Sequence, residues 1–238
     1  MRYLVLLALV PLAACSVGGD AKTSPSGVNG SKTFAVDGFS AVEATGPDDV
    51  DVRVGSGFSV RAEGDTGIMA RLEIVRNGDT LEIRRKSNSG FSWGGEKGQV
   101  KIYVTMPRIT AASTTGSGDI AIDHVEGDAF KVDATGSGDL AIASMNVQRA
   151  EFSLTGSGSV STGGTARTGS FSIAGSGDID AARLSLTQAD VDVMGSGNVS
   201  ATVAGPAKVA VTGSGDVTLT GGAKCATSKT GSGSITCS

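Results

Sequence analysis

Gly136-Ser137-Gly138-Asp139-Leu140 is one copy of a short stretch that recurs down the second half of the chain. Between residues 116 and 233 its Gly-Ser-Gly core occurs seven times, and the copies start at Gly116, Gly136, Gly156, Gly175, Gly195, Gly213 and Gly231. Successive starts are 20, 20, 19, 20, 18 and 18 residues apart. A near-constant period of this size indicates a solenoid, in which each repeat forms one coil and buries its apolar face by stacking on its neighbours.

Apolar residues alternate with small polar residues on both sides of each Gly-Ser-Gly. In the copy at Gly156, for example, Phe152 and Leu154 precede the turn and Val160 follows it. Alternate residues of a strand point to the same side, so these positions are predicted to face the interior. Glycine suits the turn because it accepts positive φ. We predict an all-β fold, a right-handed parallel β-helix with 18–20 residues per coil; an antiparallel sandwich or barrel is the alternative.

The start of the chain has the features of a bacterial lipoprotein signal. A short cationic segment and an apolar run precede Leu12-Ala13-Ala14-Cys15, which resembles the lipobox, where the signal is cut before a cysteine that carries the lipid. An ordinary signal peptide with an incidental cysteine is the alternative. We predict a signal over residues 1–14, and a lipidated Cys15 with a flexible tether over residues 15–32. Ser16 after the cysteine favours the outer membrane, by resemblance to the enterobacterial sorting pattern.

Residues 33–238 are predicted to form one domain in two parts. Residues 33–110 keep the alternation but lack the repeat, so we expect irregular coils and a cap there, and Arg76-Asn77-Gly78-Asp79 is a hairpin signal. Residues 111–238 are expected to form the regular coils. Cys225 and Cys237 would face the interior from opposite walls of the last coil, which favours a disulfide over two free thiols.

Charge and residue types narrow the range of functions. The net charge is −4 and the chain has no run of Lys and Arg, so no nucleic-acid partner is expected. His124 is the only histidine, which leaves no second imidazole for a zinc site and no other base for a Ser-His-Asp arrangement. We expect no cofactor and no enzyme activity; a polysaccharide-acting β-helix enzyme is the alternative.

Asp119 and Asp139 are the best candidates for a metal site. Each follows the turn of its coil, and carboxylates stacked in this way would suit calcium and a cation-dependent scaffold. Other coils carry Asn or Ser at the same position. Because Asp, Asn and Ser all cap turns by accepting hydrogen bonds from nearby backbone amides, we favour a turn-capping role.

Phe91 and Trp93 are the candidates for contact with a partner. They lie in a stretch that begins with Arg84 and Arg85, and aromatic and Arg side chains often anchor a glycan or a protein. The alternative is a loop whose Trp93 folds onto the cap.

Three features resemble a known family: Phe34-Ala35-Val36-Asp37-Gly38-Phe39, Tyr103-Val104-Thr105-Met106-Pro107 and the repeated Gly-Ser-Gly-Asp. They are similar to the putative auto-transporter adhesin, head GIN domain family, from about Thr33 to the C-terminus. The resemblance implies a β-helical, secreted or lipid-anchored bacterial domain without an established activity. We therefore expect a non-enzymatic, lipid-anchored envelope protein with an adhesin-like or scaffold role, whose partner is a glycan, an envelope protein or another copy.

Overall fold

The computed structural model describes residues 26–86 and 99–238, which form one mixed sheet and a single short helix. The elements are β1 (Asn29–Phe34), β2 (Ala41–Gly46), β3 (Asp49–Val54), β4 (Ser59–Asp65), α1 (Thr66–Met69), β5 (Leu72–Asn77), β6 (Thr80–Arg85), β7 (Val100–Met106), β8 (Ala111–Gly116), β9 (Ile120–Gly136), β10 (Leu140–Gly156), β11 (Ser159–Gly175), β12 (Asp178–Gly195), β13 (Val199–Val203), β14 (Pro206–Gly213), β15 (Val217–Thr220), β16 (Lys224–Gly231) and β17 (Ile235–Cys237).

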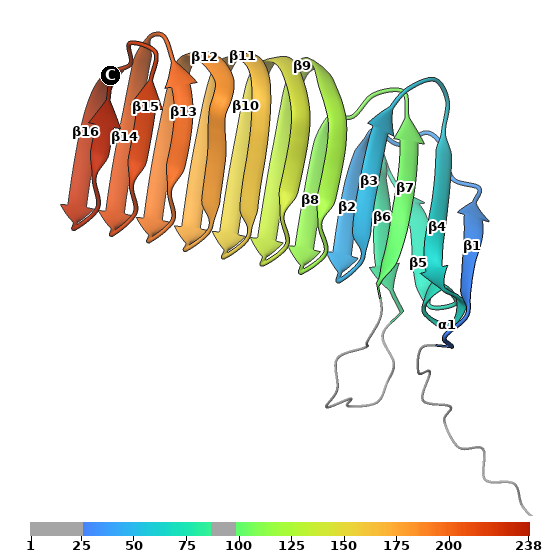
Figure 1. Ribbon diagram of the computed structural model, residues 1–238. Coiled ribbons are helices and arrows are strands. Elements are labelled where there is room, and N and C mark those ends of the chain that lie inside the picture. The colour runs from blue at the N-terminus through green and yellow to red at the C-terminus, as the bar shows by residue number, and fades with distance from the viewer. Residues whose placement is uncertain (1–25, 87–98) are drawn as a thin grey trace, which may run out of the picture.

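The long strands stack as the coils of a two-walled solenoid (Figure 1). Each of β9 to β12 rises along one wall, bends over an arch and descends along the other wall to a Gly-Ser-Gly corner. Neighbouring coils pair in parallel on both walls; for example, Leu140 lies opposite Ile120 on the rising wall and Phe152 lies opposite Val132 on the descending wall. In the last coils the two walls are separate strands, β13 with β14 and β15 with β16. The parallel β-helix predicted from the repeat is confirmed.

The core lies between the two walls and is made of the predicted inward positions. Val132, Phe152 and Val160 are each at most 1% exposed. Equivalent residues of neighbouring coils lie over one another, and the rings of Phe152 and Phe171 are stacked with their centroids 5.2 Å apart. The predicted inward face is therefore confirmed, and each coil packs its apolar residues mainly on the coils above and below it.

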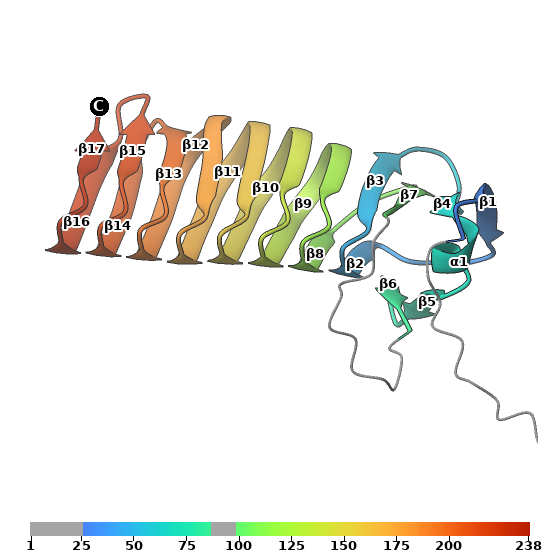
Figure 2. The same ribbon diagram turned by 60° about the horizontal axis from the view of Figure 1, so that its bottom comes forward.

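The two glycines of each corner have different roles. The first has a positive φ, for example +123° at Gly156. The last one allows a close approach, because a Cβ on Gly158 would lie 2.2 Å from the carbonyl oxygen of Gly138 in the preceding coil. No side chain fits where two corner backbones touch. As a result the corners form one continuous row along an edge of the solenoid (Figure 2).

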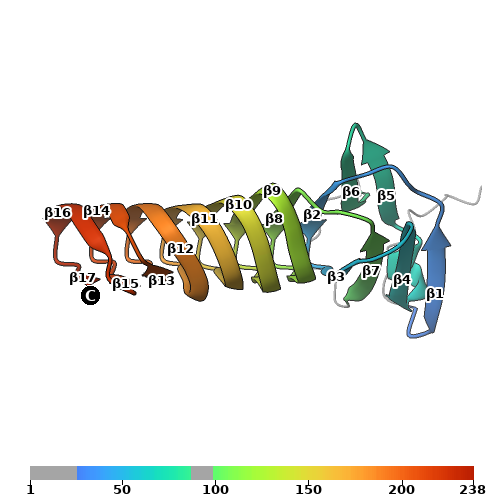
Figure 3. The ribbon, with the colours of Figure 1, turned by 90° about the horizontal axis from the view of Figure 1, so that it is seen from above.

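The N-terminal region adds an out-of-order coil and a cap. β2 and β3 form a coil whose corner is Gly46-Pro47-Asp48, and this coil is sandwiched between strands that come later in the chain. β2 pairs in parallel with both β6 and β8, and β3 pairs in parallel with both β7 and β9. Beyond it, both walls continue with antiparallel strands. On one wall β5 pairs with β6; on the other, β4 pairs with β7 and β1 pairs with β4. The hairpin predicted at Asn77 and Gly78 is confirmed, and the two walls separate at this end (Figure 3).

The predicted end of the tether at residue 32 is wrong. β1 begins at Asn29 and pairs with β4, and Ser26 and Gly27 are held by hydrogen bonds from their backbone N–H groups to Asp65. The composition of this stretch is poor in large apolar residues, which led to the prediction of a tether. Strand pairing and capping use backbone groups, so they do not need apolar side chains.

The last coil is closed by a covalent bond and by a lysine. Cys225 and Cys237 form a disulfide across the coil. Lys229 occupies an inward position, and its Nζ donates to the carbonyl oxygen of Gly233 at 2.8 Å. An inward-pointing charge on an edge strand disfavours pairing with another chain. Within residues 26–86 and 99–238, no helix is both long enough and apolar enough to span a membrane.

Candidate functional site

The aspartates after the corners form hydrogen bonds between coils. Oδ1 of Asp119 accepts from the backbone N–H of Asp139 at 2.8 Å, and Oδ1 of Asp139 accepts from that of Ser159 at 2.8 Å. The sequence analysis expected a nearby backbone amide as the donor, and the structure shows that this amide belongs to the next coil. The corners stack at backbone contact, which brings the next amide within reach.

At Asp216 such bonds also influence the acidity of the carboxyl group. The hydroxyl and backbone N–H of Ser234 both donate to Asp216 and lower the pKa of its carboxyl group. Hydrogen bonds to the charged form account for this direction. Among the described residues, no three His, Cys, Asp or Glu side chains gather as metal ligands would. Asp119 and Asp139 thus act as acceptors that link neighbouring coils.

Arg85, one of the predicted contact residues, is part of the interior. Its side chain is 8% exposed and that of Asp48 is 5% exposed. The Arg85 guanidinium donates twice to the Asp48 carboxylate, with Nε to Oδ2 at 2.7 Å and Nη2 to Oδ1. Asp48 also accepts from the backbone N–H of Val100 at 2.9 Å. The prediction of a partner contact at Arg85 is therefore wrong, because the arginine neutralises a buried carboxylate at the corner of the out-of-order coil.

Arg84 points to the other side of β6 and stays at the surface. Its side chain is 48% exposed, and it donates to Glu73 at 2.9 Å and to Glu82 at 2.8 Å. The bond and charge of Glu73 are the main cause of its raised pKa. Two carboxylates thus hold this guanidinium in place. Phe91 and Trp93, predicted to lie beside it, are outside the described residues.

Within residues 26–86 and 99–238, His124 has an acidic neighbour but no serine partner. Its Nδ1 lies 3.2 Å from Oδ2 of Asp123. The other oxygen of Asp123 accepts from the backbone N–H of Val54 at 3.0 Å. Asp123 therefore joins β9 to the end of β3, as expected of a carboxylate with a structural role.

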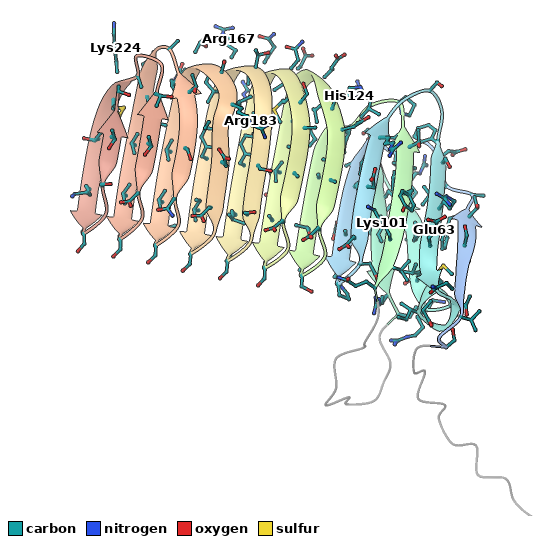
Figure 4. All side chains as sticks on the ribbon, in the orientation of Figure 1. Glu63, Lys101, His124, Arg167, Arg183 and Lys224 are labelled. Carbon is teal, nitrogen blue, oxygen red and sulfur yellow. A yellow bond between two sulfur atoms is a disulfide. The ribbon has the colours of Figure 1, made fainter. Side chains whose placement is uncertain are left out.

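A surface that the sequence analysis did not identify lies on the outer side of β4, β7 and β3. We call it the Tyr103 face; its members are Asp51, Arg53, Arg61, Glu63, Lys101 and Tyr103. Arg61, Tyr103 and Asp51 lie opposite one another in adjacent strands. Figure 4 shows Glu63 and Lys101 on this wall, at the N-terminal end of the solenoid.

Cations surround the ring of Tyr103. The guanidinium carbon of Arg61 lies 4.8 Å from the ring centroid and Nζ of Lys101 lies 5.6 Å from it. Arg61 also pairs with Glu63, and Lys101 lies 3.8 Å from Asp51. An aromatic ring flanked by fixed donors and acceptors is a common recognition surface for sugars and proteins. Tyr103 belongs to the segment Tyr103-Val104-Thr105-Met106-Pro107, on which the family resemblance partly rests. That resemblance was the only feature of the sequence that drew attention to this surface.

The comparisons with known proteins agree with this architecture. The family model described as "Putative auto-transporter adhesin, head GIN domain" matches residues 38–223. A crystal structure of a putative adhesin from Bacteroides fragilis is 22% identical, with a TM-score of 0.83 over 90% of this chain and 99% of that one. A putative lipid binding protein from Parabacteroides distasonis is 21% identical, with a TM-score of 0.71 over 90% and 98%. A putative adhesin from the same species is also 21% identical, with a TM-score of 0.67 over 90% and 99%. No curated protein matches the chain. At these identities the structural matches establish the fold.

Proposed function

Since this chain belongs to the putative auto-transporter adhesin, head GIN domain family, we propose that it is a non-enzymatic, lipid-anchored protein of the bacterial cell envelope that presents a rigid surface to a partner. Its partner class is a glycan or another envelope protein. The lipid is carried by Cys15, and the outer membrane is the proposed location.

The observation that carries this proposal is the Tyr103 face. Ion pairs hold its side chains in place before any partner arrives, with Arg61 paired to Glu63 and Arg53 lying 3.4 Å from Asp51. The strands beneath are paired on both edges, so the backbone that carries them is fixed. A preorganised surface loses little conformational entropy on binding.

A non-enzymatic role is supported by the use that the coils make of their acidic residues. The corner aspartates accept backbone hydrogen bonds, and the buried Asp48 is neutralised by Arg85. A hydrolase or lyase acting on polysaccharides needs an acid and a base with free atoms facing the substrate. The alternative of a polysaccharide-acting enzyme is tested by incubating the protein with acidic and neutral polysaccharides and measuring newly formed reducing ends.

The place where the described residues begin determines which end of the solenoid a lipid at Cys15 would hold. Ser26 and Gly27 are tied to Asp65 beside α1, so the segment leading back to Cys15 joins the capped end of the solenoid. A lipid at Cys15 would hold this end nearest the bilayer. Fractionation of cells carrying the full chain tests this: Cys15→Ser should move the protein from the membrane fraction to the soluble fraction.

The contact surface is tested with a lipid-free protein that starts at Ser16, applied to panels of glycans and envelope proteins. Tyr103→Ala should abolish the strongest interaction. Phe58→Ala is a matched control, because Phe58 is an exposed aromatic residue that packs on Phe39 elsewhere in the cap. If Trp93→Ala removes binding and Tyr103→Ala does not, the contact lies at the residues predicted from the sequence, and the Tyr103 face is not the site.

A further inference from the structure

The two edges of the regular coils differ in charge. The corner edge carries Asp119, Asp139, Asp178 and Asp216. On the opposite edge, basic residues lie at or next to the arches: Arg149, Arg167, Arg183 and Lys224. Figure 4 shows Arg167 and Lys224 at the arches and Arg183 just below them. The solenoid is thus electrically asymmetric in cross-section, although its net charge is negative.

Three arginines are the centre of the basic edge, and we call them the arginine edge. Arg149 lies on β10, Arg167 on β11 and Arg183 on β12, so three successive coils supply one guanidinium each. All three are exposed. Within the described part of the chain, their side chains form no hydrogen bond and no ion pair. In contrast, the nearby Lys131 is paired with Asp133 at 2.8 Å.

The residues between the arginines on β10 to β12 are neutral and able to form hydrogen bonds, whereas the arch of the neighbouring β9 carries the exposed Glu126 and Asp128. The neutral residues are Asn146, Gln148, Thr165, Thr168, Thr187 and Gln188. Strand register places Arg149 opposite Thr168, and Thr168 opposite Gln188. The Thr165 hydroxyl contacts Asn146 Oδ1 at 3.1 Å, and the Thr187 hydroxyl donates to the carbonyl oxygen of Arg167 at 2.5 Å, so the hydroxyls are fixed by the neighbouring coils.

We propose that the arginine edge binds a linear anionic polysaccharide that crosses the arches of β10, β11 and β12. Unpaired guanidinium groups recognise carboxylate and sulfate groups through two parallel hydrogen bonds. Neutral amides and hydroxyls between them match the hydroxyl groups of sugars. Coils follow one another at about 4.8 Å, and each of three successive coils supplies one cation. Arg149 lies opposite Thr168 on the descending side of the arches, and Arg183 lies opposite Gly163 on the rising side.

This charge spacing favours a polysaccharide over a nucleic acid. Duplex DNA carries one negative charge per about 1.7 Å of its axis, which is far denser than the cations of the arginine edge. The descending wall also carries Glu151, Asp190 and Asp192 below the arches, and these carboxylates would repel a wide polyanion. A thin chain with widely spaced charges can lie along the arches and avoid them.

The arginine edge is separate from the Tyr103 face, so this inference goes beyond the proposed function. The Tyr103 face lies on β3, β4 and β7 near the cap, whereas the arginine edge lies on β10 to β12. A substitution on one surface leaves the side chains of the other surface unchanged. Binding measurements on the two sets of variants therefore test the two proposals separately.

The test is a titration of the lipid-free protein with polygalacturonate, dextran sulfate and neutral dextran at low and at raised salt. The two anionic polymers should bind, binding should weaken as salt rises, and neutral dextran should not bind. Replacement of Arg149, Arg167 or Arg183 by Gln should weaken binding about tenfold each, the size expected for loss of one charge-assisted hydrogen bond. Arg108→Gln is the matched control, because it removes one exposed positive charge between β7 and β8, outside both the arginine edge and the Tyr103 face.

Two outcomes overturn the proposal. One is that polygalacturonate and dextran sulfate bind no more tightly than neutral dextran. The other is that Arg108→Gln weakens binding as much as Arg167→Gln, which would assign the binding of the anionic polymer to the protein's net charge. Weakened binding in the three arginine variants, with unchanged binding in Arg108→Gln, supports the proposal.

Discussion

The carboxylate of Asp139 accepts two hydrogen bonds from Ser159 in the next coil, one from its backbone N–H and one from its hydroxyl, each at 2.8 Å. Asp216 and Ser234 repeat this arrangement directly before β15 and β17. Among the described residues, the Ser159 hydroxyl accepts no hydrogen bond from the backbone of the following coil. The backbone N–H of Asp178 instead donates to the carbonyl oxygen of Gly158 at 3.2 Å.

Asp139→Ala should lower the free energy of unfolding by about 1 kcal/mol, the usual loss when a side chain that caps a backbone N–H is removed. Asp139→Asn should cost less, because Asn198 performs the same task and accepts from the backbone N–H of Asp216 at 3.0 Å. Urea unfolding of the two variants measures the difference. Equal losses for Ala and Asn would show that charge, and not the hydrogen bond, is what matters.

Thr162 should be a site where stability can be gained. It is 1% exposed, and its Oγ1 has no hydrogen-bond partner within the described residues. Thr162→Val keeps the shape and removes the unsatisfied hydroxyl, so we expect about 1 kcal/mol of stabilisation. Thr114→Val is the control: this hydroxyl is also buried but donates to the carbonyl oxygen of Gly118 at 3.3 Å, so its loss should destabilise. Thermal unfolding of both variants decides between gain and loss.

Arg85→Met should destabilise the fold by about 3–5 kcal/mol, the range for removing one partner of a buried ion pair. Among the described residues, the carboxylate of Asp48 would then keep only the hydrogen bond from the backbone N–H of Val100. Arg84→Met, on the exposed side of the same strand, should cost less than about 1 kcal/mol. Denaturation of both variants, together with the Asp48→Asn, Arg85→Met double variant, tests this. A double variant as unstable as Arg85→Met would contradict the ion-pair explanation.

Asp65 should give a defined loss of stability at low pH. Hydrogen bonds to its carboxylate, first among them the one from the backbone N–H of Ser26, lower its pKa from 3.8 to about 2. Because the folded pKa lies below the unfolded one, the stabilisation is complete above about pH 4 and is lost as the pH falls towards 2. The melting temperature should therefore fall less between pH 4 and pH 2 in Asp65→Asn than in the natural protein. An NMR titration midpoint near 3.8 for Asp65 would be the contrary result.

The regular coils could be predicted because each one contains the same pattern of glycines and apolar residues. Corner glycines and alternating apolar residues lie within about 20 residues of one another, so the period and the inward face can be read directly. The out-of-order coil gives no such signal. β3 pairs with β7 in a register that joins Asp49 to Lys101, and its corner is Gly46-Pro47-Asp48 in place of Gly-Ser-Gly. Pairing between distant segments leaves no period in the sequence.

The candidate site was harder to predict for the same reason. Arg61, Tyr103 and Asp51 come from three segments and meet only through strand register. Arg84 and Arg85 are neighbours in the sequence but face opposite sides of β6, so one is exposed and the other is buried. Without knowing which strands flank β6, the sequence does not tell which arginine faces the core.

The contact between the backbones of successive corners holds the coils in one stack. Replacement of single glycines by alanine tests this contact most directly. Gly158→Ala places a Cβ 2.2 Å from the carbonyl oxygen of Gly138 without requiring a positive φ. Gly222→Ala requires a φ of +88° but meets no atom within 4 Å. If the corners touch, urea unfolding should show a loss of about 3 kcal/mol or more for Gly158→Ala and about 1 kcal/mol for Gly222→Ala. A Gly158→Ala protein as stable as the Gly222→Ala protein would mean that the corners do not lie on one another.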